Sequence, residues 1–558
     1  MVNFYQTKHR AFRRTALSAA AVALCAGFCG NAAAFDIDTG NEDMQVRFDN
    51  TVRYNFGRRT EAQNPAILGN ANTDDGDRNF KKGSTINNRV DLLTEFDVIY
   101  QKKFGARVSA ASWYDHAYSG GFDNTSLATS NHVVNGAPAF GLSPYADRYY
   151  HGLSGEWLDA FVFGAFDLGN MPVTVRAGRH TVNWGEGLLS GGAIHGNGYA
   201  QAPLDLAKAL AVPGIEAKEL YRPLTQLSGQ IQATPELSFA GQYFFKWENT
   251  RAPESGTYLG YADHLLNGGE TLIAGPGIRA LRQPDIRPKD RGDWGLAARW
   301  SPEWLDGTMG FYVRNFSDKL PQVILKATPP LQYFLNYADN IDLYGISLTK
   351  QVAGISFGAD LNYRRNMPLI SDSTIVVTSL AALPTAGNSI GARGNTVHGV
   401  LNAIGSVGAT PLFNSASWAA ELTWNRYLSV TQGAQFFKGR ANYTAIDKVS
   451  KDFFGIAFNF TPTWYQVFPG GDLSMPISYS RGLSGNSAVT SGGNKDAGSY
   501  AVGLGLDLYQ KYRFDLKYVD YFGKYATNPT TGALTVPNGT QALIEDRGAV
   551  YLTFKTTF

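Results

Sequence analysis

Cysteine is almost absent from this sequence. The two cysteines, Cys25 and Cys29, lie near the N-terminus in a segment typical of an export signal. Basic residues precede an apolar run at 16–28, and the alanines at 32–34 offer small residues for cleavage. We expect residues 1–34 to be removed as a Sec-type signal peptide, because the apolar run is shorter than the roughly 20 residues that cross a bilayer. The mature chain then has no thiol for a disulfide, a nucleophile or a metal site.

Charge is scarce and balanced. Lys and Arg number 49 against 47 Asp and Glu, which gives a formal net charge of +2 at pH 7. Residues 1–34 hold basic side chains but no acidic ones, so the mature chain is slightly negative. A nearly neutral chain provides no basic field, and no nucleic-acid partner is expected.

Long apolar runs are missing after the signal, so the chain is either secreted and soluble or embedded in a membrane as strands.

The eight histidines show no His-x-x-x-His spacing. Ser154, Ser190 and Ser484 lie in glycine-rich runs without completing Gly-x-Ser-x-Gly. We therefore expect no enzyme, no cofactor and no metal site. The acidic run at 74–77 has carboxylates that suit calcium, but the favoured interpretation is a solvated loop.

Alternation with a period of two dominates the rest of the chain. Apolar residues occupy the even positions from 44 to 57, with Asn50 as the exception, and polar residues occupy the odd positions. The pattern returns over 90–100 and, after the short turn 101–103, over 104–110. Such segments are strands with one apolar face.

The last residues, 546–558, form another such strand. Val550, Leu552, Phe554 and Phe558 share one parity, opposite polar residues. A strand that stops on a C-terminal aromatic resembles the closing strand of bacterial outer-membrane β-barrels. No sheet edge can stay open in hydrocarbon, so we expect this strand, with Phe554 and Phe558, to close the wall against the strand at 44–57.

The order of long connection, strand, tight turn and strand recurs along the chain. It predicts an all-β protein whose residues 35–558 form a single transmembrane antiparallel β-barrel, with long extracellular loops and short periplasmic turns. Seventeen strands can be recognised, and bacterial barrels use an even number, so we expect about eighteen, with sixteen as the alternative. The eighteenth is expected at 434–446, and 368–415 is expected to be the longest loop. The residues at the polar positions of these strands carry charges of both signs, which predicts a lumen with ion pairs.

The connection 183–223 is unusually long for a barrel loop. Leu204 to Val212 can form about two helical turns that Pro213-Gly214 would end. The hypothesis is that this loop is a plug or lid at the mouth of the barrel. Its candidate lumen or lid contacts are Arg176, Arg179, His180, Trp184, Glu186 and Lys218. In the alternative, Trp184 belongs to an interfacial aromatic belt and the charges only fix the loop.

The run Arg176-Ala177-Gly178-Arg179-His180-Thr181-Val182-Asn183-Trp184-Gly185-Glu186 resembles the signature of the proteobacterial family called domain of unknown function 1302. Blocks at 213–216, 288–290, 315–321 and 476–479 follow in the order of that family. His180 departs from it, because the family pattern has Gln there.

This resemblance implies an outer-membrane barrel that accompanies a second exported protein and transporters of the resistance-nodulation-division type, near genes for using steroids or alkanes. The expected function is a passive channel or translocation component for small, hydrophobic solutes. The alternative is a non-conducting barrel that docks a periplasmic partner or transporter. Expected partners also include outer-membrane lipid, lipopolysaccharide and the barrel assembly machinery.

Overall fold

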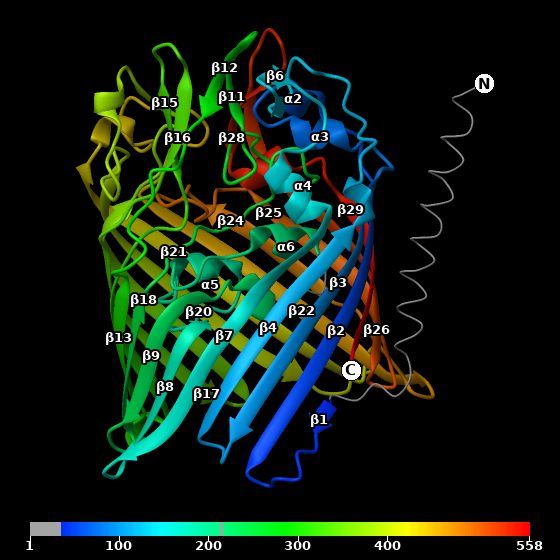
Figure 1. Ribbon diagram of the computed structural model, residues 1–558, viewed down its shortest axis with the longest axis vertical. Helices are drawn as coiled ribbons and strands as arrows, with labels where there is room; N and C mark the ends of the chain where they lie inside the picture. Colours follow the sequence, from blue (N-terminus) through cyan, green and yellow to red (C-terminus); the bar gives the residue numbers. More distant parts are fainter. Residues whose placement is uncertain (1–34, 213–214, 216) are drawn as a thin grey trace.

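The computed structural model describes residues 35–212, 215 and 217–558 (Figure 1), so the predicted signal peptide at 1–34 lies outside the described residues. Eighteen strands form one closed antiparallel barrel. In ring order they are β2 (Met44–Arg59), β3 (Thr85–Tyr100), β4 (Phe104–Asp115), β7 (Gly152–Leu168), β8 (Met171–His180), β9 (Leu224–Gln232), β10 (Leu237–Phe244), β13 (Trp294–Trp300), β14 (Gly307–Phe316), β17 (Ile341–Val352), β18 (Ile355–Pro368), β20 (Arg393–Val407), β21 (Ser415–Gln432), β22 (Asp452–Phe468), the interrupted strand β23 (Gly471–Ser474) and β24 (Ile477–Ser484), β25 (Gly498–Leu508), β26 (Tyr512–Phe522) and β29 (Ala549–Thr557).

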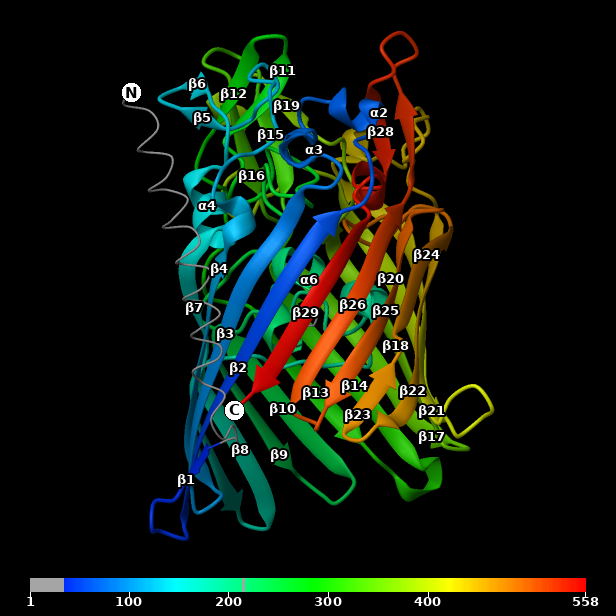
Figure 2. The same cartoon turned by 90° about the vertical axis from the view of Figure 1, so that its right-hand side faces the viewer.

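The seam of the barrel lies where the sequence predicted it. β2 pairs with β3 on one side and with β29 on the other. In the β2–β29 register Tyr54 faces Phe554, and the N–H and C=O of Phe558 both bond Asn50 just beyond the strand. Figure 2 shows β29 running beside β2 and β26. The first and last wall strands therefore close the ring and leave no free edge there.

The two ends of the barrel differ. Short turns gather at the lower end in Figure 1, and we call this the short-turn end; they are 101–103, 169–170, 233–236, 301–306, 353–354, 408–414, 469–470 and 509–511. The opposite, long-loop end carries 60–84, 116–151, 181–223, 245–293, 317–340, 369–392, 433–451, 485–497 and 523–548. This asymmetry confirms the predicted alternation of long loops and short turns.

The long loops carry the remaining structure. Helices are α2 (Pro65–Leu68), α3 (Asp75–Asn79), α4 (Pro144–Tyr150), α5 (Ser190–His195), α6 (Leu206–Ala211) and α7 (Ala217–Leu220). A five-stranded sheet joins β11 (Thr271–Gly275), β12 (Ile278–Arg282), β16 (Gln332–Asn336), β15 (Gln322–Lys326) and β19 (Ile375–Val377) above the barrel. Within the described part of the chain, every helix is too short or too polar to cross a membrane.

The position of the eighteenth strand was predicted wrongly. Residues 434–446 contain a short 3-10 helix, η4 (Ala434–Phe436), and the Phe437 ring is buried against Tyr427 of β21. The missing strand is β20, inside the stretch expected to be the longest loop. In β20, Val397, Gly399 and Leu401 alternate with residues that include the apolar Val400. This weak contrast between its two faces hides the strand.

The two faces of the wall differ in polarity. On β29, Leu552 is 47% exposed on the outside, whereas its neighbour Thr553 is 2% exposed and donates to Asn55 in the interior. Large apolar side chains are exposed around the outside of the strands, as a lipid-facing surface requires. Charged side chains line the inside, where Arg89 pairs with Asp91 at 2.7 Å and Arg513 with Asp515 at 2.8 Å. The predicted lumen with ion pairs of both signs is confirmed.

Candidate functional site

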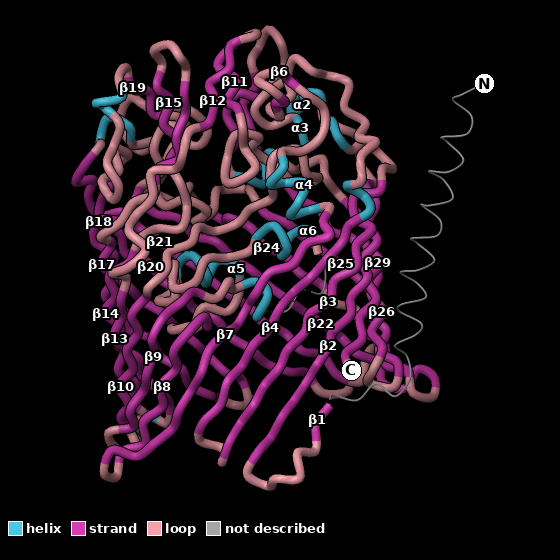
Figure 3. The backbone as a smooth tube through the Cα atoms, in the orientation of Figure 1, coloured by secondary structure: helices cyan, strands magenta, loops and turns pink. Residues whose placement is uncertain are grey.

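Loop 183–223 extends into the interior of the barrel. Figure 3 shows α5 and α6 between the near and far walls. The loop leaves β8 and returns to β9, yet α5 packs against β20, β21 and β22 on the far side of the ring. The loop therefore crosses the lumen. Its residues 213, 214 and 216, with the predicted stop at Pro213-Gly214, lie outside the described residues.

Glu421 of β21 binds the loop backbone at the start of α5. Its carboxylate accepts hydrogen bonds from the N–H groups of Leu188 at 2.8 Å, Leu189 at 2.9 Å and Gly192 at 2.7 Å. The side chain is buried, so its charge is compensated largely by these three donors. A Cβ at Gly192 would meet the Glu421 carboxylate and would lie 2.6 Å from the Cα of Gly187, so glycine is required at this contact.

Asp360 of β18 makes a second connection of the same kind. Its carboxylate accepts from the N–H of Glu186 at 3.0 Å and from the N–H of Asn197 at 2.9 Å. Nearby, Arg364 donates to the carbonyls of Ile194 and Gly196. The buried wall charges thus bind the loop main chain on both sides of α5.

Two histidines form a further buried contact between loop and wall. His195 at the end of α5 and His398 of β20 approach with their Nδ1 atoms 2.9 Å apart. The other nitrogen of His195 lies 2.9 Å from the carbonyl of Gly492, which can only accept, so it carries the proton. His398 then donates from Nδ1 to His195, and its Nε2 lies 2.9 Å from the hydroxyl of Thr396.

Three of the predicted site residues contact this arrangement. Trp184 is buried inside the barrel against Tyr312 of β14, with ring centroids 6.1 Å apart, so it does not belong to an interfacial belt. The main-chain groups of Glu186 bond Asp360 and Asn402. Lys218 in α7 pairs with Glu95 of β3.

The other three predicted residues belong to β8 and bind elsewhere. Arg176 lies over the ring of Phe161, 5.7 Å from its centroid. Arg179 pairs with Glu248 at 2.9 Å, and Glu248 also binds Arg222 next to the end of the loop. His180 Nε2 lies 2.7 Å from the hydroxyl of Ser228 on β9. Arg179 thus reaches the loop through Glu248.

The predicted helix in the loop is present as α6. The Asp205 side chain accepts from the N–H of Lys208 and so caps the first turn. Asp205 also pairs with Arg251 at 3.0 Å, and Lys208 pairs with Glu156 of β7 at 2.9 Å. These ion pairs fix α6 between the wall and loop 245–293.

A small cavity lies beside α5 and α6. Its lining includes Trp184, Ile194, Tyr199, Leu206 and Tyr221, and its volume is about 40 Å³. A water molecule needs about 10–15 Å³ of such space, so the cavity holds a few waters and no larger solute. A solute that takes this route requires the loop to shift.

The sequence patterns missed Asp360 and Arg364 as wall residues that hold the loop, because a charged residue in a strand indicates the inner face but not its partner. Glu421 was missed for the same reason, since it is a charged residue in β21. The sequence also contains a Gly-x-Ser-x-Gly run at 387–391. It lies in an irregular loop where Ser389 accepts from the N–H of Gly391, without the strand-to-helix turn that exposes a nucleophile.

The acidic run at 74–77 is not a solvated loop. Asp74, Asp75 and Asp77 are buried, because loops 116–151 and 245–293 cover this part of loop 60–84. Asp77 pairs with Arg59 at 2.6 Å. The expectation of a solvated loop was therefore wrong.

Several solved outer-membrane proteins resemble the chain only distantly. OpdK of Pseudomonas aeruginosa, solved with vanillate, is 9% identical, with a TM-score of 0.39 over 92% of this chain and 98% of that chain. OccD3 (OpdP) of the same organism is 11% identical, with a TM-score of 0.40 over 94% and 93%. A BenF-like porin from Pseudomonas fluorescens Pf-5 is 12% identical, with a TM-score of 0.38 over 93% and 99%. Likenesses at this level say nothing about substrate or mechanism.

No curated protein matches the sequence. A family model described as protein of unknown function, DUF1302, matches residues 15–558, and the chain belongs to this family.

Proposed function

We propose that the protein is a passive channel of the outer membrane, in which loop 183–223 is the constriction. The observation that carries this proposal is the attachment of the loop to the far wall by Glu421 and Asp360, which accept from its backbone N–H groups. A segment held across a polar lumen by hydrogen bonds can restrict passage and can also be released. Solutes would move down their gradient.

The orientation follows from the two ends of the barrel. Bacterial outer-membrane barrels carry short turns on the periplasmic side and long loops outside. The short-turn end would therefore face the periplasm, and the long-loop end would lie among lipopolysaccharide. The apolar outer face of the strands supports a lipid environment, and insertion would require the barrel assembly machinery.

The lining beside the loop supports small, hydrophobic solutes. Trp184, Ile194, Leu204, Leu206 and Tyr221 line the cavity at the constriction. When a steroid-like or alkane-like solute passes an apolar patch in the lumen, no polar wall groups there have to lose their bound water. This avoids a free-energy cost that a charged wall would impose. The family resemblance points to the same class of solute.

Replacing residues 204–212 by a Gly/Ser segment of equal length tests the constriction. The segment would lose α6 and its bonds to Glu156 and Arg251. We expect a larger single-channel conductance in planar bilayers and faster solute entry into proteoliposomes. The matched control replaces 529–532, the exposed tip of loop 523–548, and should behave as wild type. Unchanged conductance and selectivity in the 204–212 variant would refute the role of the loop.

A second candidate function is a closed barrel that docks a periplasmic protein or a transporter of the resistance-nodulation-division type. The small cavity beside the loop favours it, since about 40 Å³ admits no solute. Bilayer recordings separate the two functions. Steady openings of the wild-type barrel support the channel, whereas silence together with co-purification of one periplasmic protein supports the platform.

A further inference from the structure

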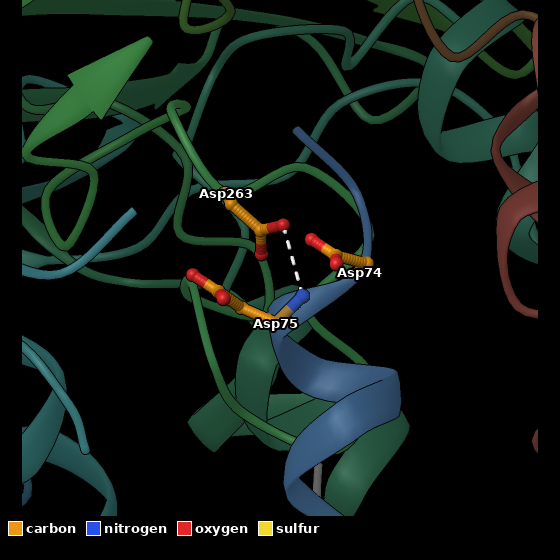
Figure 4. A group of neighbouring side chains, drawn as sticks. All are labelled: Asp74, Asp75 and Asp263. Atoms are coloured by element: carbon orange, nitrogen blue, oxygen red, sulfur yellow. Dashed lines mark hydrogen bonds between the residues drawn. The ribbon is translucent and has the colours of Figure 1, made fainter. Parts of the chain in front are cut away.

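Three aspartates from two distant loops meet at the long-loop end. Asp74 and Asp75 stand at the start of α3 in loop 60–84, and Asp263 lies in loop 245–293. Figure 4 shows the carboxylates of Asp74 and Asp263 facing each other, with the Asp75 side chain beside Asp263. One carboxylate oxygen of each residue lies within 4.8 Å of the others. The cluster depends on the fold, because the sequence separates its two halves widely.

All three side chains are buried, with relative exposures of 0% for Asp74, 3% for Asp75 and 0% for Asp263. Each carboxylate has one oxygen with a protein partner: Asp74 accepts from Arg78, Asp75 from the N–H of Asn131 at 2.8 Å, and Asp263 from the N–H of Asp75 at 3.1 Å. The Oδ1 atom of each carboxylate is buried without any hydrogen-bond partner in the described structure. Three unpaired buried oxygens in one cluster call for a ligand.

Three arginines lie near the cluster, and among the described residues one of them is bonded to it. Arg78 binds Asp74 directly. Arg547 donates to the carbonyls of Tyr258 and Gly260, and Arg279 donates to carbonyls of loop 116–151, so neither is bonded to the three carboxylates. Burial and the neighbouring carboxylates raise the pKa of Asp75 well above its usual value. Burial, followed by repulsion from Asp74, raises the pKa of Asp263 to about 7.

We propose that Asp74, Asp75 and Asp263 form a binding site for one calcium ion that joins loops 60–84 and 245–293. Carboxylate oxygens are the ligands that hard divalent cations prefer, and calcium accepts irregular sets of them at 2.3–2.6 Å. Two ligands on opposite sides of such an ion lie up to about 5 Å apart, which agrees with the spacing of the cluster. Magnesium fits less well, because it usually keeps several waters and uses one or two carboxylates.

The ion would also support the loop in the lumen. Loop 245–293 contains Arg251, which pairs with Asp205 at the start of α6. Calcium would hold loop 245–293 to loop 60–84 and so fix the surface against which α6 packs. This inference stands on the cluster alone and does not require that the barrel conducts.

The test uses the purified full barrel in detergent, stripped with EDTA and titrated with calcium chloride by calorimetry. We expect one calcium ion per chain. We also expect calcium to raise the temperature at which protease begins to cleave loops 60–84 and 245–293. D75N and D263N should each weaken binding at least tenfold. The control D290N alters an exposed carboxylate of the same loop and should bind as wild type.

A pH series distinguishes calcium binding from simple sharing of protons. With the pKa of Asp263 near 7, a proton competes with the ion, so affinity should fall about tenfold between pH 8 and pH 6. Heat-modifiable migration on gels confirms that each variant is a folded barrel. Absence of calcium binding by the wild type at millimolar concentration would overturn the proposal. Unchanged binding by folded D75N and D263N would also overturn it.

Discussion

Glu421 acts on the loop in the lumen through charge. Its three N–H donors all come from the main chain of residues 188–192. Hydrogen bonds to a charged group contribute about 1.5–3 kcal/mol, against about 0.5–1.5 kcal/mol for neutral pairs. An amide at this position keeps the shape but loses the charge and one of the two acceptor oxygens. The attachment of α5 to β21 should weaken, while the barrel wall stays unchanged.

Glu421→Gln should therefore release the loop more often. A loss of about 1–2 kcal/mol raises the open population by about 5- to 30-fold. In single-channel recordings we expect more frequent openings, with the barrel fold retained by gel mobility. Glu236→Gln in an exposed turn at the short-turn end is the matched control. The same opening frequency in Glu421→Gln and wild type would contradict the proposed attachment.

Sequence patterns located residues better than they located contacts. The motif around Trp184 and Glu186 marked the correct segment, because a long loop between two clear strands is visible in the alternation. Glu421 carries no signal beyond one polar position in a strand, since its partners are main-chain groups more than 200 residues away. Contacts to a backbone leave no side-chain pattern at the other end, so the sequence cannot reveal them.

At the scale of elements, the position of α5 allows a direct test of motion. A Cβ built on Gly191 would lie 2.7 Å from the Cγ2 atom of Thr423 on β21. Because a Cβ at Gly191 would contact the Thr423 side chain, we choose these two positions for an engineered disulfide, which needs Cβ atoms about 3.5–4.5 Å apart. Residues 35–558 contain no cysteine, so the double variant Gly191→Cys/Thr423→Cys would place one pair of cysteines in the barrel.

We expect the oxidised double variant to show fewer openings than the wild type, and dithiothreitol to restore them. The cross-link removes the freedom of α5 to leave β21, while the wall stays intact. Each single cysteine variant serves as a control, because it cannot form the bond within one chain. If oxidised and reduced forms conduct equally, the loop does not gate the channel by moving away from β21.

Strand assignment from alternation succeeded where the two faces differ strongly. β2 and β3 combine long side chains outside with charges inside, and their bounds were close to those predicted. β20 failed because glycine and alanine on the outer face and Val400 inside reduce the contrast. The stretch 434–446 attracted the prediction instead, since Phe437, Ala441 and Tyr443 there alternate weakly with polar and basic residues. The even-number rule for barrels still gave the correct total.

At the scale of the whole molecule, the closed ring depends on one seam. β29 is held by β2 and β26, and the hydrogen bonds between Phe558 and Asn50 extend this pairing to the last residue. Phe554 packs against Phe514 with ring centroids 5.0 Å apart, on the outer face. The predicted closure by the first and last wall strands therefore rests on main-chain pairing. The alternation of apolar and polar residues along both strands indicated it in the sequence.

Phe558→Asp tests whether the terminal aromatic serves assembly or stability. Near a membrane interface a charged side chain costs a barrel only about 0–1 kcal/mol, so the assembled variant should melt within a few degrees of the wild type. We nevertheless expect the amount that reaches the outer membrane to fall severalfold, because the resemblance of the last strand to barrel closing strands implies that the assembly machinery recognises a C-terminal aromatic. The measurement is the heat-modifiable fraction in isolated outer membranes, compared with Gln510→Asp in an exposed turn at the same end. Full yield of Phe558→Asp would show that β29 closes the wall without a signal from its last side chain.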